Sequence, residues 1–389
     1  MAQDNLLQIY KRFDITLSKG DGVYLFDTKG KKYLDFASGI GVCALGYRHK
    51  TYTQDLHKQI NKILHSSNLF YNENIEKATQ NLANASGLEK VFFVNSGTEA
   101  MEGAFKVAKK FAYKKNIKNP QFIAFKNSFH GRTLGALSLT ANEKYQKPFK
   151  PLIQGVKFAK FNDIESVKKL INKKTVAIII ETVQGEGGIT VAEKTFFQAL
   201  RKLCDENDIL LIADEIQCGM GRSGKFFVYQ YFDVLPDVLA SAKALGCGIS
   251  VGAFVLGKKV TSILELGDHG TTYGGNPLAC AAVNAVFKAY KEDDILANVK
   301  KLGIYFEEKL DMFAKKYSFV KKRQGIGFMQ SLSLKSDVKV ADVIKKAQEN
   351  SLLIISCGKN DLRFLPPLII TKEHINEMFH KLDSSLSEF

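Results

Sequence analysis

Seven short apolar runs between residues 91 and 257 restrict the folds that are open to this 389-residue chain. Each is followed by a longer stretch, in most cases amphipathic, before the next begins. Continuous apolar runs of this kind indicate strands buried on both faces, as in a mainly parallel sheet with helices on both faces. The pattern therefore predicts an α/β protein with a seven-stranded sheet. The runs are VFFV (91–94), FIAF (122–125), VKFA (156–159), VAIII (176–180), ILLIA (209–213), DVLAS (237–241) and GAFVLG (252–257).

Two further regions flank this pattern. Residues 20–41 contain two alternating runs broken at 28–30 (Thr-Lys-Gly), which predicts a hairpin. After the sheet, a helical stretch over about 276–317 leads to the runs GFMQSLSL, LLIIS and LRFLPPLII, with helices between them. We expect this tail to form a smaller α+β domain that the N-terminal hairpin joins. The predicted division is an N-terminal segment (1–55), a large domain (56–290) and a small C-terminal domain (291–389).

Composition excludes several classes of protein. With 45% apolar and 24% charged residues, the chain matches an ordinary globular enzyme long enough for two domains. Its longest apolar runs are far shorter than the roughly 18 residues that a membrane-spanning helix needs, so no membrane association is predicted. The first 14 residues do not resemble a signal peptide, and the six cysteines lack C-x-x-C spacing. These features favour a cytoplasmic protein with reduced thiols and no metal site.

The net charge of +15 raises a second hypothesis, because basic proteins can bind nucleic acid or anionic surfaces. The basic residues are scattered at helix-compatible spacing, for example in 106–120 and 165–174, where apolar residues separate them. Such segments are typical of solvated faces of amphipathic helices. No nucleic-acid motif accompanies them, and no nucleic-acid partner is predicted.

Three of the apolar runs end in ionisable residues: Glu181, Asp214 and Lys243. Their spacings of 33 and 29 residues each equal about one strand-helix-strand unit. Because ligands of open α/β sheets bind beyond the carboxyl ends of the strands, we expect these side chains to converge on one crevice. Partial burial of Lys243 would depress its pKa and make the amine a nucleophile, and a buried Asp214 needs a positive partner. For Lys243 alone, an exposed strand end is the alternative.

Two loops add binding chemistry. NSGTEA (95–100) leads from a strand into a helix, and the free amides and hydroxyls of such a turn can hold a phosphate. It lacks both the P-loop and the dinucleotide-binding glycine pattern, so a phosphate without a nucleotide is indicated. In SFHGRT (128–133), Phe129 could cap the core or stack on a flat heterocycle. A phosphate cradle, an aromatic plate, a buried aspartate and a strand-end lysine together predict a site for pyridoxal 5′-phosphate.

With these residues in view, the sequence resembles the class III aminotransferases, which are fold type I pyridoxal-phosphate enzymes, over nearly its whole length. Eight ordered blocks carry the resemblance, and HSSNLFYNE (65–73) and FHGRT point within the family to enzymes acting on acetylornithine. One departure is GYRHK (46–50), where the family usually has G-H-x-H-P. The blocks are YLDFASGIGV, NSGTEA, SFHGRT, ETVQGEGG, ADEIQCGMGRSG, PDVLASAKALGCG, HGTTYGGNP and RFLPPL.

The resemblance implies a role for each cofactor-binding residue. Lys243 condenses with the aldehyde of pyridoxal phosphate and later moves a proton, while Asp214 pairs with the pyridine nitrogen. The other implied contacts are Gln217 to the phenolic oxygen, Gly97 and Thr98 to the phosphate, Phe129 stacked on the ring, and Thr272 reaching the phosphate from a neighbouring subunit. A homodimer with shared active sites is therefore expected.

The resemblance also implies how substrates bind. Arg132 would hold the α-carboxylate of N2-acetylornithine and later the γ-carboxylate of glutamate, because a guanidinium is the usual carboxylate clamp. Arg363 would hold glutamate's α-carboxylate, and Glu186 would mask it by an ion pair in the other half-reaction. Thr271 would help to bind the acylated substrate. Ile40, unlike the tyrosine of ornithine aminotransferases, cannot hydrogen-bond a free α-amine and so favours an acylated nitrogen.

The predicted activity is transfer of the δ-amino group of N2-acetyl-L-ornithine to 2-oxoglutarate by a ping-pong mechanism in arginine biosynthesis. Products are N-acetyl-L-glutamate 5-semialdehyde and L-glutamate. Open alternatives are succinylornithine or succinyl-diaminopimelate aminotransferase, ornithine or 4-aminobutyrate aminotransferase, and a glutamate-semialdehyde aminomutase. Acyl selectivity is the least determined feature, since one extra contact discriminates by only about 1–3 kcal/mol.

Overall fold

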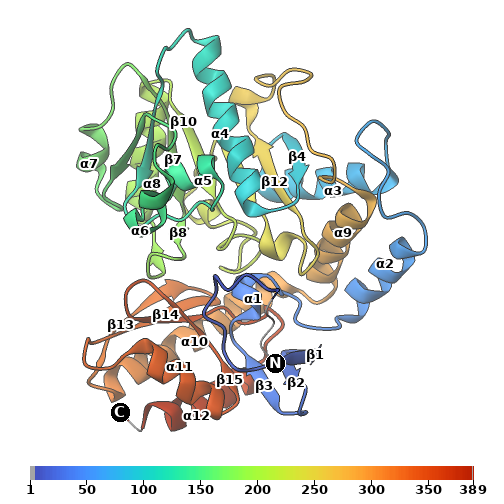
Figure 1. Ribbon diagram of the computed structural model, residues 1–389, viewed down its shortest axis with the longest axis vertical. Helices are drawn as coiled ribbons and strands as arrows, with labels where there is room; N and C mark the ends of the chain where they lie inside the picture. Colours follow the sequence, from blue (N-terminus) through green and yellow to red (C-terminus); the bar gives the residue numbers. More distant parts are fainter. Residues whose placement is uncertain (1–4, 388) are drawn as a thin grey trace.

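A seven-stranded sheet forms the centre of the computed structural model, which describes residues 5–387 and 389 (Figure 1). Its strand order is β4-β12-β11-β10-β7-β5-β6. Within it only β12 runs antiparallel to its neighbours. Each predicted apolar run supplies one strand, so the α/β prediction is confirmed. The bounds are β4 (Lys90–Val94), β5 (Gln121–Phe125), β6 (Val156–Ala159), β7 (Thr175–Glu181), β10 (Leu210–Asp214), β11 (Val238–Ser241) and β12 (Gly252–Leu256).

Helices cover both faces of this sheet, and side-chain alternation along each strand explains why. Successive residues of a strand point to opposite faces. In β7, Ile178 packs into a core that includes Phe197 of α8 (Lys194–Glu206), whereas Ile179 packs into a separate core with α4 (Gly97–Lys114). All seven residues of β7 are buried, as expected for a strand enclosed on both sides.

Two smaller sheets join the ends of the chain. The predicted hairpin is present as β2 (Tyr24–Asp27) and β3 (Lys32–Asp35), with β1 (Leu17–Asp21) beside it. The LLIIS run is divided: its first part pairs with β3, and its last part enters the C-terminal sheet β13-β14-β17-β16. Figure 1 shows the N-terminal strands lying beside the C-terminal elements. The division at residues 55 and 290 stays a prediction. The bounds are β13 (Val320–Ile326), β14 (Met329–Leu334), β15 (Leu352–Leu353), β16 (Ile355–Cys357) and β17 (Asp361–Phe364).

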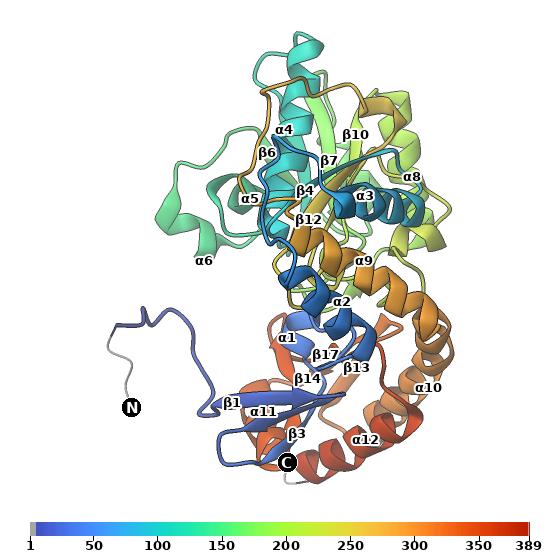
Figure 2. The ribbon, with the colours of Figure 1, turned by 90° about the vertical axis from the view of Figure 1, so that its right-hand side faces the viewer.

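The single helical stretch expected over 276–317 is two helices, α9 (Pro277–Glu292) and α10 (Ile295–Lys316). Asp294 has a left-handed backbone with φ +49°, and this conformation ends the first helical path and starts the second. Aspartate tolerates that conformation better than most residues. Figures 1 and 2 show the pair running from the large sheet towards the C-terminal sheet.

The remaining elements are short or lie at the periphery. Across residues 5–387 and 389, no helix combines the length and the apolar character that crossing a membrane requires. These elements are α1 (Ser38–Gly41), α2 (Lys50–Ile60), α3 (Glu73–Ser86), α5 (Leu134–Leu139), α6 (Glu143–Gln146), α7 (Ile164–Lys168), β8 (Val183–Gln184), β9 (Thr190–Val191), α11 (Val340–Glu349), α12 (Lys372–Leu386) and four short 3₁₀ turns, Lys147–Phe149, Val228–Tyr231, Lys243–Leu245 and Lys258–Val260.

A fully buried arginine holds three distant parts of the chain together. Arg222 donates to the carbonyl oxygens of Pro366 at 2.8 Å, Phe328 at 3.3 Å and Gly41 at 3.4 Å. Its burial lowers the guanidinium pKa to about 10. Carbonyl oxygens rather than a carboxylate accept the hydrogen bonds of its two terminal nitrogens, while Nε has no hydrogen-bond partner. These bonds fix the N-terminal loop and the C-terminal sheet against the loop after β10.

Packing of α4 on the sheet requires a glycine at position 103, and this generates the first prediction. A Cβ there would lie 2.3 Å from two ring atoms of Phe254 in β12. Alanine normally stabilises a helix relative to glycine, but overpacking a core costs roughly 1–3 kcal/mol. Gly103→Ala is therefore expected to lower the midpoint of thermal unfolding. Gly270→Ala is the control, because no atom lies within 4 Å of its Cβ position; an unchanged or raised midpoint for Gly103→Ala would contradict the packing argument.

Candidate active site

Three strand ends bring ionisable side chains to one cavity of about 400 Å³. Asp214 lies opposite Glu181 of β7 and opposite Ala240 of β11, three residues before Lys243. Because these strands are parallel, their carboxyl ends lie at one edge of the sheet. Glu181, Asp214 and Lys243 all line the cavity. The sheet register alone therefore explains their convergence.

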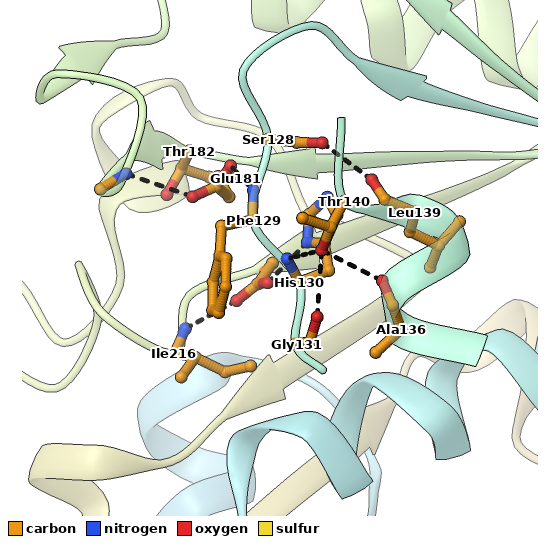
Figure 3. A network of polar contacts seen from close by, with 12 residues as sticks. Ser128, Phe129, His130, Gly131, Ala136, Leu139, Thr140, Glu181, Thr182 and Ile216 are labelled. Carbon is orange, nitrogen blue, oxygen red and sulfur yellow. Dashed lines mark hydrogen bonds and ion pairs between the residues drawn. The ribbon is translucent and has the colours of Figure 1, made fainter. Parts of the chain in front are cut away.

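The Asp214 carboxylate is held by a histidine that the sequence did not single out. Asp214 is buried; its Oδ1 accepts the Ile216 amide at 3.0 Å, and its Oδ2 lies 2.7 Å from His130 Nδ1 (Figure 3). A carboxylate can only accept, so Nδ1 carries the proton. His130 is itself oriented by its backbone amide, which donates to Thr140 Oγ1 at 2.9 Å. The histidine thus fixes the carboxylate that faces the cavity.

Glu181 organises the two loops beside Asp214. Its Oε2 accepts the Phe129 amide at 3.1 Å and its Oε1 accepts the Gly185 amide at 3.2 Å (Figure 3). Burial, followed by the charge of Asp214, raises the pKa of Glu181 well above its ordinary value. The carboxyl thus ties the aromatic plate at Phe129 to the turn that carries Glu186.

The Lys243 amine has the environment of a nucleophile. The side chain is half-buried in the cavity, and desolvation lowers its pKa to about 8, although Glu186 opposes the shift. The residue has φ +50°, which is uncommon for a side chain other than glycine. The amides of Gly246 and Cys247 both donate to its carbonyl at 3.1 Å and hold this conformation. The backbone therefore aims a readily deprotonated amine into the cavity.

The first turn of α4 supplies a site for an anion. Ser96 caps the helix by accepting the Glu99 amide at 3.2 Å, and Gly97 and Thr98 line the cavity. Amides of a first turn have no partner within the helix and carry its positive dipole end. At Gly97 a Cβ would lie 2.8 Å from Ile216, so a larger residue would fill the cradle. The turn fits a phosphate group.

The two predicted arginines have different surroundings. Arg363 of β17 is 3% exposed, and its Nη1 lies 2.5 Å from Glu186 Oε1 and 3.2 Å from Gln217 Oε1. Burial by itself would raise the pKa of Glu186, but the positive charge and hydrogen bond of Arg363 outweigh burial and lower this pKa. Arg132 lines the cavity and is exposed, with its guanidinium 3.5 Å from the centre of the Tyr145 ring. One arginine is thus masked by a carboxylate and the other is accessible.

Four predicted residues lie outside the cavity lining: Ile40, Thr271, Thr272 and Arg363. Arg363 reaches the cavity only through the lining residues Glu186 and Gln217. Ile40 is 45% exposed, while Val42 lines the cavity in its place. Thr271 is reached through Asn95, a lining residue whose Nδ2 donates to its hydroxyl at 3.3 Å. Thr272 is exposed at the surface. The substrate and phosphate contacts expected of these four stay predictions.

The assembled groups fit pyridoxal 5′-phosphate. One cavity presents the nucleophilic amine of Lys243, the buried carboxylate of Asp214 and the aromatic ring of Phe129. The N-terminus of α4, at Gly97 and Thr98, lines the same cavity. Among the residues that the structure describes, no cluster of three or more histidine, cysteine, aspartate or glutamate side chains could hold a metal ion. An aldehyde, a basic ring nitrogen, a flat ring and a phosphate would each find a partner here.

Comparison with known families decides the assignment. The sequence model described as Aminotransferase class-III matches residues 8–386. The chain belongs to the class-III aminotransferases. Enzymes of this family use pyridoxal phosphate, in agreement with the cavity.

Related proteins match this class-III aminotransferase over nearly their full lengths. The acetylornithine aminotransferase of Clostridium acetobutylicum is 44% identical, over 99% of this chain and 100% of the relative. That of Methanocaldococcus jannaschii is 45% identical over 98% and 96%. Among solved structures, the ornithine aminotransferase from Toxoplasma gondii aligns with TM-score 0.95 at 29% identity, covering 99% of this chain and 92% of that one. The N-acetylornithine aminotransferase from Stenotrophomonas maltophilia gives 0.86 at 31%, covering 98% and 97%.

Sequence reasoning overlooked the supporting residues of this aminotransferase. His130 stands in the quoted FHGRT block but received no role, although a histidine next to the aromatic plate was a visible signal. Glu181 was noted only as a strand-end charge. Their contacts join residues 52 and 84 positions apart, so no local pattern shows them.

The lowered pKa of Lys243 gives a prediction about its reactivity. In protein stripped of cofactor, the rate of labelling of Lys243 by dinitrofluorobenzene should rise with pH and reach half its maximum near pH 8, because only the neutral amine attacks. Glu186→Gln removes a negative charge that stabilises the ammonium, so the inflection should move to lower pH. Peptide mass spectrometry would follow the labelling.

Glu165→Gln provides the matched control, because Glu165 is an exposed carboxylate paired with Lys168. It should leave the inflection in place. An inflection of Lys243 near that of an ordinary lysine, or an upward move in Glu186→Gln, would contradict the electrostatic account.

Proposed function

We propose that the protein transfers the δ-amino group of N2-acetyl-L-ornithine to 2-oxoglutarate, giving N-acetyl-L-glutamate 5-semialdehyde and L-glutamate. The observation that carries the proposal is the unequal state of two arginines, with Arg363 masked by Glu186 and Arg132 accessible. Such a site suits one substrate that offers a single carboxylate to Arg132. It also suits a second substrate whose two carboxylates bind both arginines. Relatives named acetylornithine aminotransferase at 44–45% identity support this choice.

The chain's own residues perform binding and proton transfer. Pyridoxal phosphate, when bound, supplies an aldehyde that receives the amino group and a ring that withdraws electrons from the adjacent carbon. Lys243 Nζ, with a pKa of about 8, would take the proton from the substrate carbon that bears the amino group and deliver it to the cofactor carbon that carried the aldehyde oxygen. Asp214 would hold the ring nitrogen by charge, with His130 keeping the carboxylate in place. Gln217 and Phe129 would hold the ring, and Gly97 and Thr98 the phosphate.

The two arginines would serve the two substrates in turn. Arg132 would bind the α-carboxylate of the acylated donor while Glu186 stays on Arg363. When 2-oxoglutarate or glutamate enters, its second carboxylate would replace Glu186 on Arg363. Glu186 is 37% exposed at its side chain and can turn towards solvent, whereas Arg363 is fixed by β17. The movable partner of the ion pair is therefore the carboxylate.

Selectivity for an acylated nitrogen is assigned to Ile40 and Thr271. Ile40 lies in the short α1 turn, where all four residues, 38–41, have positive φ. For Ser38 and Ile40, which are not glycine, this conformation is strained and persists only where packing enforces it. Its side chain offers no hydrogen bond to a free α-amine. Ornithine and 4-aminobutyrate are thus the less favoured substrates, and succinylated donors are the nearest alternative.

A substrate comparison tests this proposal. The kcat/KM for N2-acetylornithine should exceed that for ornithine or 4-aminobutyrate by about fivefold to 150-fold, since a buried amine without a partner costs about 1–3 kcal/mol. Turnover should require 2-oxoglutarate, which an aminomutase would not need. A free amine preferred over both acetylated and succinylated donors would overturn the assignment; preference for the succinylated donor would move it to the named alternative.

We further propose a homodimer with shared active sites. Thr272 is exposed and does not line its own subunit's cavity, although the resemblance assigns it to the phosphate. Next to it, Asn68 donates to the carbonyl oxygens of Thr271 and Gly274, and the residues after Asn68 are unusually exposed. These are Leu69 (88%), Phe70 (70%) and Tyr71 (96%). Apolar surface of this kind is typical of a contact with another copy.

Mixing two variants tests the shared site. Lys243→Ala should abolish turnover, and Thr272→Ala should weaken cofactor binding. If Thr272 acts on the partner's cofactor, unfolding and refolding an equal mixture should restore native function in about a quarter of the sites, because half the dimers are mixed and each has one intact site. Activity equal to that of the separate variants would show that Thr272 acts within its own subunit.

The location proposed for the enzyme is the cytoplasm. All six cysteines are free, which agrees with a reducing compartment. One related acetylornithine aminotransferase, from Debaryomyces hansenii, is described as mitochondrial.

A further inference from the structure

The segment that carries Arg132 closes on itself. The Ala141 amide donates to Ser128 O at 3.1 Å. Ser128 Oγ donates to Leu139 O at 2.8 Å, as Figure 3 shows. Thr140 Oγ1 donates to Gly131 O at 3.2 Å across the same loop. Residues 128–141 thus form a closed loop whose ends are joined by hydrogen bonds. Arg132 lies on this closed loop, and α6 follows it directly.

Gln146 fixes α6 against this closed loop. Its Nε2 donates to Leu137 O at 3.0 Å and Thr140 O at 2.9 Å, and the residue is buried. Asn142 caps the start of α6 by accepting the Lys144 amide at 3.1 Å. Tyr145 lies between these two anchors, directly before Gln146. The backbone that carries its ring is therefore fixed independently of Arg132.

Arg132 is oriented by aromatic rings instead of by polar partners. Its guanidinium carbon lies 3.5 Å from the centre of the Tyr145 ring and 5.8 Å from that of Phe129. Within residues 5–387 and 389, no hydrogen bond or ion pair to its guanidinium was found. A flat guanidinium stacked on a ring keeps its N–H groups pointing outward around its edge. Those donors are free for a ligand.

The neighbouring residue anchors the opposite side of Arg132. Thr133 Oγ1 donates to Glu102 Oε1 at 2.5 Å, and the Ala136 amide donates to the same oxygen at 3.2 Å. Glu102 belongs to α4, the helix whose first turn lines the cavity. The backbone of Arg132 is thus fixed to α4 while its side chain rests on α6.

We propose that Tyr145 is a positioning residue that holds the Arg132 guanidinium in the plane required to bind a substrate carboxylate through two N–H groups. This rests on the proposed function, in which Arg132 receives a carboxylate in both half-reactions. The aromatic ring of Tyr145 provides this orientation without occupying the N–H donors of Arg132. A carboxylate in its place would have to be displaced by the substrate, as we propose for Glu186 on Arg363. Tyr145 thereby makes Arg132 the permanently available clamp.

Two variants and two substrates test this inference in the holoenzyme. Tyr145→Leu removes the ring, and Tyr145→Phe keeps it. N-acetylputrescine is N2-acetylornithine without its carboxylate and gives the matched control substrate. For N2-acetylornithine, Tyr145→Leu should lower kcat/KM about threefold to thirtyfold, mainly through KM, as loss of a cation–π contact implies. Tyr145→Phe should stay within about twofold, and both variants should use N-acetylputrescine as the wild type does.

The outcomes separate positioning from structure. Equal loss with both substrates, or no loss with N2-acetylornithine, would overturn the inference. In Arg132→Leu, the further change Tyr145→Leu should have no effect on kcat/KM; an additive loss would also count against it. Should Tyr145→Leu not fold, Tyr145→Gln removes the ring with a polar side chain and takes its place.

Failure of the proposed function is distinguishable from failure of this inference. If wild-type enzyme rejects N2-acetylornithine, the same comparison is made with the amino acid that it does accept and the decarboxylated form of that amino acid. Loss confined to the carboxylated form would then still support Tyr145, while the substrate assignment alone would fall.

Discussion

The buried carboxylate of Asp214 is the constraint on which the site depends. A charge at the end of a central strand is costly to bury unless polar groups hold it, and here Ile216 and His130 supply two hydrogen bonds. His130 in turn depends on Thr140, which belongs to the same closed loop. Satisfying one charge therefore orders a segment that also carries Phe129 and Arg132. The need to compensate the buried charge of Asp214 at the end of β10 thus fixes the loop that carries these two cavity residues.

The three charged strand ends have distinct environments. Burial raises the pKa of Glu181 and lowers that of Lys243, so both move towards their neutral forms. Glu186 keeps its charge because Arg363 lies beside it. A cavity of this kind contains an amine that loses its proton more readily than an ordinary lysine, and a carboxylate that could face a cationic ring nitrogen. The reaction class follows from these differences rather than from the fold.

The substrate alternation that we propose would depend on contacts between distant parts of the chain. Arg363 comes from the C-terminal sheet. Glu186 comes from the loop after β8, which follows β7 of the large sheet. The buried Arg222 fixes the same junction through carbonyl oxygens of residues 41, 328 and 366. The junction is thus held at Arg222 by three carbonyl oxygens and at Glu186 by a single ion pair. In the proposed mechanism that ion pair would open while the Arg222 contacts stay in place.

The sequence alone determined the seven strands, the hairpin and the convergence of Asp214 and Lys243, because hydrophobic runs and strand-end charges are local patterns. It did not reveal the break at Asp294, the division of 352–356 between two sheets, or the supporting roles of His130, Glu181 and Tyr145. Those features depend on which residues meet across long separations and on how buried charges are compensated. Hydrogen bonding between segments 52 to 177 positions apart leaves no periodic trace, so only the tertiary structure decided it.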